Sequence, residues 1–325
     1  MPSLFGSVRA KALFALACVP LLLLSACGNN GNGGGAGTTG SNTSKNASIS
    51  ITVGGKLDTE SQLLTKLYTL VLRDQGFKVN EKPAFGNNTI VFQGIKSGAI
   101  DLYPEFTATG LDALKKTSTL DDQKDYDTVK AGFKDQFQID WLDYSPLNDT
   151  YAICAKDGNS MGLKTVSDLT AKAKQITFDL PSDSAYVVDY LKAKYGLTMQ
   201  SFKATHKVDY AIGFKEVAGG QADANFCYSS DNGINVNKLV ALQDDKHAFP
   251  AYHPAPIVRD SVLQKAPAIK DALNALAPKI TTDASLQLQK DVDANAAQGM
   301  SKSKAITEAA TKFLKDQGLC KNGCQ

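Results

Sequence analysis

Hydrophobic and polar positions along the chain alternate between strand-like and helix-like spacing. Residues 50–55 (Ser-Ile-Thr-Val-Gly-Gly) predict a buried strand that runs into a tight turn. Residues 59–75 carry apolar side chains at helical spacing and stop at Gly76, which predicts an amphipathic helix. Further strands are predicted at 77–79 and 100–103, with a helix at 88–97 between them. This alternation indicates an α/β fold with a largely parallel sheet.

One unit of this pattern occurs in each half of the chain. The unit consists of a helix, a glycine that ends it, and a strand that begins with aspartate. This aspartate is Asp101 in the first half and Asp223 in the second. An aromatic residue follows each aspartate shortly afterwards, Tyr103 in the first case and Tyr228 in the second. The repetition favours two lobes built on one plan, although any α/β protein repeats such units.

Two irregular stretches divide the chain, at 141–151 and at the proline-rich 249–256. Two crossings between lobes place both ends of the folded chain in the first lobe. We therefore expect lobe I to comprise 48–146 plus 250–325 and lobe II to comprise 147–249. The segment 260–317 is predicted to be strongly helical. A cleft between two lobes is a natural ligand pocket.

The N-terminus predicts export. Residues 1–26 combine two basic residues, Arg9 and Lys11, with an apolar run of 12–24 that is short for a membrane span. The following Leu-Ser-Ala-Cys at 24–27 resembles a lipobox, so Cys27 is expected to be the lipidated first mature residue. Its diacylglycerol would anchor the protein on the extracytoplasmic face of the cell membrane. The alternative is an ordinary signal peptide with a chance cysteine.

The segment 27–47 is predicted to be a flexible tether behind this anchor. It consists almost wholly of Gly, Asn, Thr and Ser after Cys27. Such a segment lacks the apolar residues that offset the entropy of ordering a chain. It would hold the folded domain off the membrane surface.

The charge balance argues against a nucleic-acid partner. The whole chain is formally +2, and Arg9 and Lys11 of the leader account for both charges, which leaves a neutral mature chain. No stripe of Lys and Arg stands out, so nucleic-acid binding has no electrostatic support. No other apolar run is long enough to span a bilayer.

Four cysteines remain in the mature chain besides Cys27. Outside the cytoplasm, an even set suggests disulfides. Cys320 and Cys324 are close enough to form a small loop at the C-terminus. Cys154 and Cys227 lie in two strand-like segments, where they either pair or stay buried and free.

The residues give no sign of an enzyme. None of the three histidines, His206, His247 and His253, lies in a catalytic motif or is spaced with a cysteine as in a zinc site. Neither a Gly-x-Ser-x-Gly motif nor a phosphate-binding loop after a strand is present. We therefore expect no catalytic activity, no metal site and no cofactor.

Five segments carry a resemblance to a known family. They are Gly-Gly-Lys-Leu-Asp-Thr-Glu at 54–60, Ile-Asp-Leu-Tyr-Pro-Glu-Phe-Thr-Ala-Thr at 100–109, Asn-Asp-Thr-Tyr-Ala at 148–152, Leu-Lys-Thr-Val-Ser-Asp-Leu at 163–169 and Phe-Pro-Ala-Tyr-His-Pro-Ala-Pro-Ile-Val-Arg at 249–259. In this order they resemble the binding proteins for glycine betaine, choline and carnitine of the ProX and OpuC type. The resemblance covers the whole folded region.

The resemblance implies an α/β, two-lobed, periplasmic-binding-protein-like fold of type II with a ligand cleft between the lobes. It implies an extracytoplasmic solute-binding protein of an ABC importer, expected to be a monomer that closes on its solute and docks on a membrane permease. Such proteins hold a quaternary ammonium in a box of aromatic rings, whose faces attract a cation that has no N–H to donate. By motif, the box here is formed by Phe106, Tyr151, Tyr228 and Tyr252. By motif also, Lys56 and Thr109 reach a solute carboxylate.

Departures from the family pattern bear on the choice of solute. Phe106 replaces a tyrosine, and the segment 178–190 holds Asp179, Asp183 and Asp189 but no arginine. Some members use an arginine there against the ligand carboxylate, so its absence favours choline-like cations, and Asp183 favours a cationic alcohol. The same fold with a polar aromatic or amino-acid-like solute is the first alternative. A structural lipoprotein with a vestigial cleft is the second.

Overall fold

The structure, a computed structural model, describes residues 45–181 and 187–324. The predicted leader 1–26, Cys27, positions 28–44 of the tether and Asp183 lie outside the described residues. Asn46, which falls in the predicted tether, is buried, and its side-chain amide donates a hydrogen bond to the carbonyl oxygen of Gln75 at 2.8 Å. Contacts with the folded domain therefore reach two residues further toward the N-terminus than residue 48.

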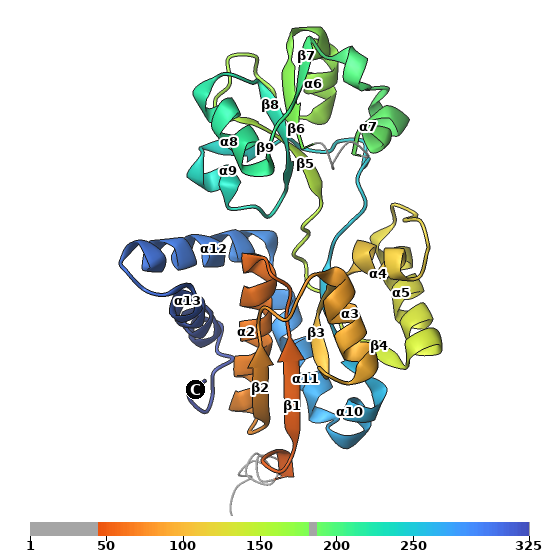
Figure 1. Cartoon of the computed structure of the whole chain (residues 1–325), viewed down its shortest axis with the longest axis vertical. Coiled ribbons are helices and arrows are strands. Elements are labelled where there is room, and N and C mark those ends of the chain that lie inside the picture. The colour runs from red at the N-terminus through yellow and green to blue at the C-terminus, as the bar shows by residue number, and fades with distance from the viewer. Residues whose placement is uncertain (1–44, 182–186, 325) are drawn as a thin grey trace, which may run out of the picture. The chain divides into compact units, whose positions relative to one another are not determined.

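The strands form two five-stranded sheets (Figure 1). The sheet of the proposed lobe I contains β1 (Ser50–Gly54), β2 (Lys78–Lys82), β3 (Leu102–Phe106), β4 (Ile139–Trp141) and β10 (Pro254–Arg259). The sheet of the proposed lobe II contains β5 (Tyr151–Lys156), β6 (Thr177–Leu180), β7 (Ala204–Lys207), β8 (Ala224–Tyr228) and β9 (Leu239–Ala241). We keep the names lobe I and lobe II for the residue ranges given above.

The two sheets have the same topology. Their strand orders are β2-β1-β3-β10-β4 and β7-β6-β8-β5-β9. In each, the first three strands are parallel, whereas the fourth runs antiparallel to both of its neighbours. Four of the five strands in each sheet therefore run in one direction, so the sheets are largely parallel, as expected, apart from one reversed strand in each. Strands β5 and β10 enter their sheets directly from the other half of the chain, without the crossover helix that keeps consecutive strands parallel.

Helices cover both faces of each sheet. Lobe I contains α2 (Thr59–Asp74), α3 (Asn88–Ser97), α4 (Thr107–Ala113), α5 (Asp122–Phe137), α10 (Asp260–Lys265), α11 (Ala268–Leu276), α12 (Thr282–Ala297) and α13 (Lys302–Asp316). Lobe II contains α6 (Val166–Lys172), α7 (Val187–Tyr195), α8 (Tyr210–Gly219) and α9 (Gly233–Val236). Each sheet thus has two buried apolar clusters, one for each face. In the part of the chain that the structure describes, no helix combines the length and the apolar character needed to cross a membrane.

The predicted helices begin and end where local signals place them. Asn87 caps α3 by accepting a hydrogen bond from the backbone N–H of Ile90 at 3.1 Å. Helices α3 and α8 end at Gly98 and Gly220, both with φ of +80°, a left-handed conformation that favours glycine.

The predicted repeat is confirmed in its hydrogen bonds. The Asp101 carboxylate accepts from the backbone N–H of Thr52 on β1 at 2.8 Å. The Asp223 carboxylate accepts in the same way from Thr177 at the start of β6, also at 2.8 Å. Since β1 and β6 occupy equivalent places in the two sheets, each aspartate joins equivalent strands. The two sheets are therefore built on one plan.

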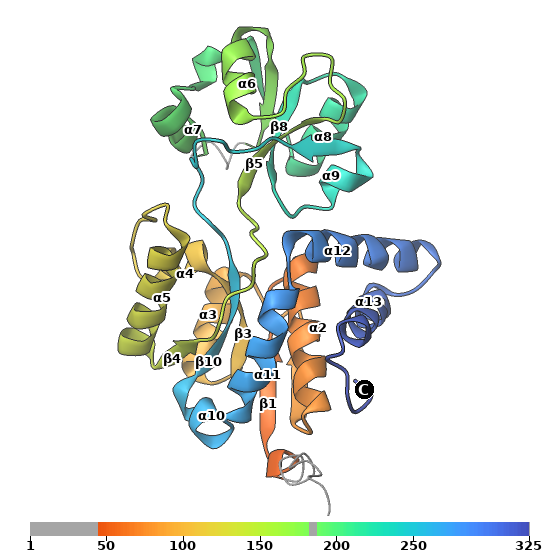
Figure 2. The same cartoon turned by 180° about the vertical axis from the view of Figure 1, so that it is seen from behind.

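Two chain segments connect the halves, one before β5 and one before β10 (Figure 2). They are hydrogen-bonded to each other. The Thr150 hydroxyl donates to the carbonyl oxygen of Pro250 at 2.7 Å. The backbone N–H of Tyr252 donates to the Asn148 side chain at 2.8 Å, and that of Asp149 donates to the Tyr252 carbonyl at 3.0 Å. The two crossings thus form a hydrogen-bonded pair of connections.

A disulfide joins Cys154 on β5 to Cys227 on β8. This resolves the alternatives that the sequence leaves open for these two residues in favour of a pair. The bond covalently ties the antiparallel strand of lobe II to its neighbour, 73 residues away in the sequence.

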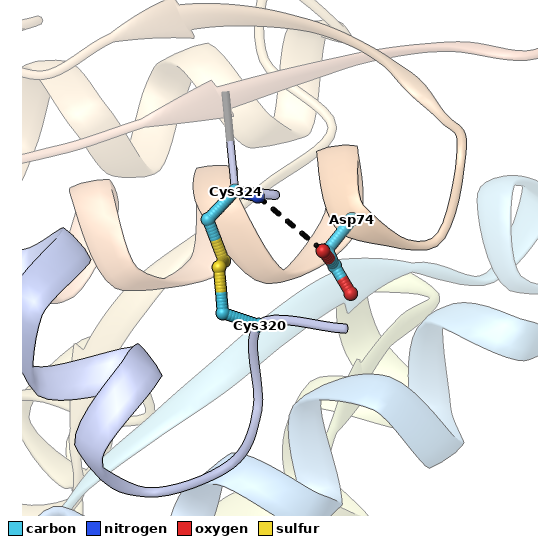
Figure 3. A group of neighbouring side chains, drawn as sticks. All are labelled: Asp74, Cys320 and Cys324. Atoms are coloured by element: carbon cyan, nitrogen blue, oxygen red, sulfur yellow. Dashed lines mark hydrogen bonds between the residues drawn. A yellow bond between two sulfur atoms is a disulfide. The ribbon is translucent and has the colours of Figure 1, made fainter. Parts of the chain in front are cut away.

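The second disulfide, Cys320–Cys324, closes a small loop at the C-terminus (Figure 3). The carboxylate of Asp74, at the end of α2, accepts hydrogen bonds from the backbone N–H groups of Lys321 at 2.9 Å and Asn322 at 2.6 Å. The tail is thereby held on α2. Asp74, Cys320 and Cys324 lie together, but the two sulfur atoms are bonded to each other, so neither cysteine offers a thiolate to a metal.

Candidate ligand-binding site

A cavity of about 510 Å³ is lined by residues from both lobes. Lobe I contributes the start of α2, the end of β3, α4 and α12, and lobe II contributes the start of α8 and the end of β8. The crossing segments contribute Asp149 and Tyr252. The volume of the cavity lies within the range typical of small-molecule pockets.

Sheet topology explains why rings from both lobes reach this cavity. Phe106 is the last residue of β3, and Tyr228 is the last residue of β8. These strands occupy the same place in the two sheets. In α/β proteins, ligands bind outside the carboxyl ends of the strands, which is where both rings lie.

The structure brings five of the six predicted ligand residues to this cavity, namely Lys56, Phe106, Thr109, Tyr228 and Tyr252. The sixth, Tyr151, lines a neighbouring cavity together with Tyr252. The ring centroid of Tyr151 lies 5.2 Å from that of Tyr252 and 5.6 Å from that of Tyr228. The hydroxyl oxygens of Tyr151 and Tyr252 are 2.5 Å apart. Tyr151 therefore packs behind the two rings that line the main cavity.

A fourth ring, Tyr210, lines the cavity and was missed by the sequence analysis. Its ring centroid lies 5.9 Å from that of Tyr228, and its hydroxyl accepts a hydrogen bond from the Tyr228 backbone N–H at 3.1 Å. It is the first residue of α8 and belongs to none of the segments that carry the family resemblance. No local signal marks it, because its place depends on how α8 packs on the sheet.

Lys56 is already paired in this cavity. Its ammonium lies 2.6 Å from Oε1 of Glu105 and 5.0 Å from the ring centroid of Phe106. The other Glu105 oxygen accepts from the Tyr103 hydroxyl at 2.6 Å. Tyr103 itself is fully buried and belongs to the core. The positive charge of Lys56 is thus neutralised by a buried carboxylate.

Four carboxyl groups also line the cavity, those of Asp58, Glu60, Asp149 and Asp231. Among the described residues of the lining, Lys56 is the one basic side chain. The lining therefore contains four acidic groups and one basic group, and that basic group is paired with the buried carboxylate of Glu105.

Glu60 lies in the first turn of α2 and is 8% exposed. It accepts hydrogen bonds from the hydroxyls of Ser285 and of Ser230, the latter at 3.3 Å. Burial, and after it the negative charge of Asp149, hold the pKa of Glu60 well above its ordinary value. Because Ser230 belongs to lobe II, this buried acid contacts both lobes.

Asp149, on the first crossing, accepts a hydrogen bond from the Ser230 hydroxyl at 2.5 Å. Burial raises its pKa to about 7, and the negative charges of Asp58 and Asp231 add to this effect. Asp149 and Glu60 lie within two of the segments that carry the family resemblance, so the sequence held a signal for them. A cation in the cavity would favour the ionised forms of both groups.

Comparison with known proteins identifies the family. Residues 49–316 match the family described as the substrate binding domain of the ABC-type glycine betaine transport system. The chain belongs to this family. It is accordingly a substrate-binding protein, and its fold class is the one expected from the sequence.

Individual relatives resemble the chain in sequence, and a solved structure resembles it in fold. The chain is 28% identical over 252 residues to the carnitine transport binding protein OpuCC of Listeria monocytogenes, which covers 75% of this chain and 81% of the relative. It is 27% identical over 290 residues to the glycine betaine-binding protein YehZ of Escherichia coli K12, with 85% and 93% covered. A crystal structure described as a glycine betaine/carnitine/choline ABC transporter superposes with a TM-score of 0.74 at 23% identity, covering 83% of this chain and 99% of that one.

These comparisons agree with the expectation that the chain is not an enzyme, since the family and the relatives are binding proteins of transport systems. They also agree with an extracytoplasmic location, which the family's role implies.

Proposed function

We propose that this substrate-binding protein captures a quaternary ammonium cation of the choline class in the cavity described above and delivers it to an ABC permease. The observation that carries the proposal is the composition of one cavity, which has four aromatic rings and four carboxyl groups in its lining. Phe106, Tyr210, Tyr228 and Tyr252 would form the aromatic box.

The rings suit a cation that cannot donate hydrogen bonds. A trimethylammonium group has no N–H, so its positive charge is best met by the negative faces of aromatic rings. Each such contact contributes about 0.5–2 kcal/mol, depending on how well water is excluded. Several rings together can replace the hydration shell that the cation loses.

The carboxyl groups distinguish among quaternary ammonium solutes. Glycine betaine and carnitine carry a carboxylate, which would face Asp58, Asp149 and Asp231 across the cavity. The ammonium of Lys56 is engaged with Glu105, so it has little free charge to offer a solute carboxylate. Thr109 remains available as a hydroxyl donor. We therefore rank choline, a cationic alcohol, above the two zwitterions.

Capture would proceed by closure of the lobes on the solute. Ser230 of lobe II contacts Glu60 of α2, and its carbonyl oxygen accepts from the Gln289 side chain of α12 at 2.7 Å. These contacts join the lobes beside the cavity, at a place where a bound cation would add contacts from both sides. The closed conformation makes more contacts with the solute, so solute binding makes it the more populated one. We further propose that Cys27 carries the lipid anchor that keeps the protein near its permease.

Calorimetric titration of the purified protein with choline, glycine betaine and carnitine tests the proposal. We expect choline to bind most tightly. Replacing Tyr252→Leu keeps an apolar side chain but removes the ring face, and should weaken choline binding about 5- to 30-fold, the equivalent of about 1–2 kcal/mol. The matched variant Tyr252→Phe keeps the ring and should bind nearly as well as the parent.

Two outcomes would contradict the proposal. Equal loss of affinity in Tyr252→Leu and Tyr252→Phe would assign the effect to the hydroxyl contact with Tyr151 and not to the ring. Failure of all three solutes to bind, with binding of a flat polar aromatic compound, would leave the transport role standing and place the solute outside the quaternary ammonium class.

A further inference from the structure

Three adjacent strands of lobe II present polar side chains in register beneath α8. Asp179 on β6 is paired with His206 on β7 and with Asn225 on β8. Directly paired residues of neighbouring strands point to the same face of a sheet. Gly213 of α8 lies over this row, because a Cβ added there would be 3.3 Å from the Cβ of Asn225. A sheet face covered by a helix is normally apolar, so a polar row there needs a physical reason.

Part of this row is not satisfied by the hydrogen bonds of the described residues. The side chain of Asp179 is fully buried; its Oδ1 lies 3.1 Å from Nδ1 of His206, whereas its Oδ2 has no hydrogen-bond partner among those residues. The side-chain oxygen of Asn225 is buried and lacks a donor in the same way. A buried polar group without a partner costs about 1–3 kcal/mol, and a charged one costs more. Two buried oxygens of this row thus lack a partner, and a metal cation is a partner that a carboxylate oxygen can bind.

A third element completes the cluster. Glu216 on α8 lies so that its carboxylate, the Asp179 carboxylate and a ring nitrogen of His206 offer atoms all within 4.8 Å of one another. The cluster thus combines two carboxyl groups and one imidazole, which are donor groups that transition-metal ions bind.

The spacing of these atoms fits metal coordination. Nδ1 of His206 lies 3.1 Å from Oδ1 of Asp179 and 4.0 Å from Oε2 of Glu216. Ligand atoms bound at about 2.0–2.1 Å to a tetrahedral zinc ion are about 3.3 Å apart. The first distance is close to this value, and the second reaches it by a small movement of Glu216, whose side chain is 30% exposed.

We propose that Asp179, His206 and Glu216 bind a divalent transition-metal ion such as Zn²⁺. An imidazole nitrogen among the ligands favours zinc and its neighbours over calcium or magnesium, which prefer oxygen ligands only. The side chain of His206 is 46% exposed, so an ion can enter from solvent.

The bound metal would tie the edge strand β7 and helix α8 to β6. Helix α8 begins at Tyr210, which lines the solute cavity, so the metal would stabilise the element that carries this ring. The site is separate from the cavity lining, and its ligands come from two strands and a helix. For that reason no short motif in the sequence signals it, and the expectation of no metal site rests on spacing to cysteines alone.

Titration of the chelator-treated protein with ZnCl₂, followed by calorimetry, tests this proposal. We expect one equivalent to bind, with CaCl₂ giving no comparable signal. His206→Gln should weaken zinc binding by at least the ~10–100-fold loss that follows removal of even an outer partner of a metal ligand. His247→Gln, a histidine outside the cluster, serves as the matched control and should bind as the parent does.

Two further readouts separate a real site from a disturbed fold. Co²⁺ in place of Zn²⁺ should give the visible absorption of a tetrahedral site in the parent and in His247→Gln, and not in His206→Gln. Zinc should raise the melting temperature of the parent but not of His206→Gln, whose far-ultraviolet circular dichroism should match the parent's. Equal zinc affinity in His206→Gln and the parent, or equal binding of Ca²⁺ and Zn²⁺, would overturn the proposal.

Discussion

The ammonium of Lys56 lies 2.6 Å from Oε1 of Glu105, and the two side chains are only 8% and 2% exposed. The same Glu105 oxygen accepts a hydrogen bond from the backbone N–H of Phe106 at 2.9 Å. The Lys56 ammonium also lies 5.0 Å from the ring centroid of Phe106, and both residues line the cavity. The ion pair neutralises the charge of the one basic side chain in the described lining.

Lys56→Met should therefore act mainly on stability. It leaves Glu105 buried without its cation, and breaking a buried ion pair in this way costs about 3–5 kcal/mol. Urea unfolding measures the loss. In the double variant Lys56→Met/Glu105→Gln the uncompensated charge is gone, so most of the loss should be recovered. If the stability losses of Lys56→Met and Glu105→Gln simply add in the double variant, the two side chains are not coupled as the structure places them.

Binding of a cation should release protons near neutral pH. Asp149, with a pKa raised to about 7, is partly protonated in the empty cavity at neutral pH, and the pKa of Glu60 is also raised, by burial first and then by the charge of Asp149. A bound choline favours their ionised forms, so its affinity should rise with pH through 7, by up to ~tenfold per pH unit for one proton released. Calorimetry at pH 7 in phosphate and in Tris detects the proton through the difference in buffer heats. Identical heats in both buffers would exclude this linkage.

The same carboxyl predicts the pH dependence of stability in the empty protein. The pKa of Asp149 is raised on folding from 3.8 to about 7. Its contribution to stability is therefore fully present below the unfolded pKa and is lost as pH rises through about 7, at most ~1.4 kcal/mol per pH unit. Melting temperatures between pH 5 and 8 should show this decline. Asp149→Asn keeps an oxygen that can accept from Ser230 but cannot titrate, so the decline of melting temperature with pH should become flatter. An unchanged slope would assign the decline to another group.

The fold could be anticipated where signals are local. The helices α2 and α3 are predicted by periodicity and by the glycines that end them, and the helix–glycine–aspartate unit predicts the equivalence of the two sheets. The direction of β5 and β10 could not be anticipated. Strand direction depends on where the chain enters the sheet, which is a long-range property that no periodicity records.

The candidate site likewise combines residues that the sequence predicts with residues that it does not. Phe106 and Tyr252 lie within distinctive segments, and Tyr228 follows the second repeat, so the sequence predicts all three, and the structure places them in the cavity lining. Tyr210 reaches the cavity only because α8 packs on its sheet. The pairing of Lys56 with Glu105 is likewise invisible in the sequence, since it joins two residues 49 positions apart. Motifs thus identified the rings, whereas the charge balance of the cavity required the fold.

Because Asp101 and Asp223 make equivalent hydrogen bonds, we expect mutation of either to cause a similar loss of stability. Asp101→Ala removes the acceptor of the Thr52 backbone N–H on β1, and Asp223→Ala removes that of the Thr177 backbone N–H on β6. Each should lower the free energy of unfolding by about 1–3 kcal/mol. Asp→Asn at either position keeps an acceptor and should cost less. Denaturant unfolding of the four variants tests this, and equal losses for Ala and Asn would contradict it.

The central claim is that the cavity recognises positive charge on a trimethylated group. The most direct test compares choline with 3,3-dimethyl-1-butanol, which has the same shape but a neutral carbon in place of the nitrogen, by calorimetric titration of one protein preparation. With four rings and four carboxyl groups in the lining, we predict that choline binds at least ~100-fold more tightly, the equivalent of about 3 kcal/mol from several ring contacts. Equal affinity for the two compounds would show that shape alone is recognised, and would contradict the account.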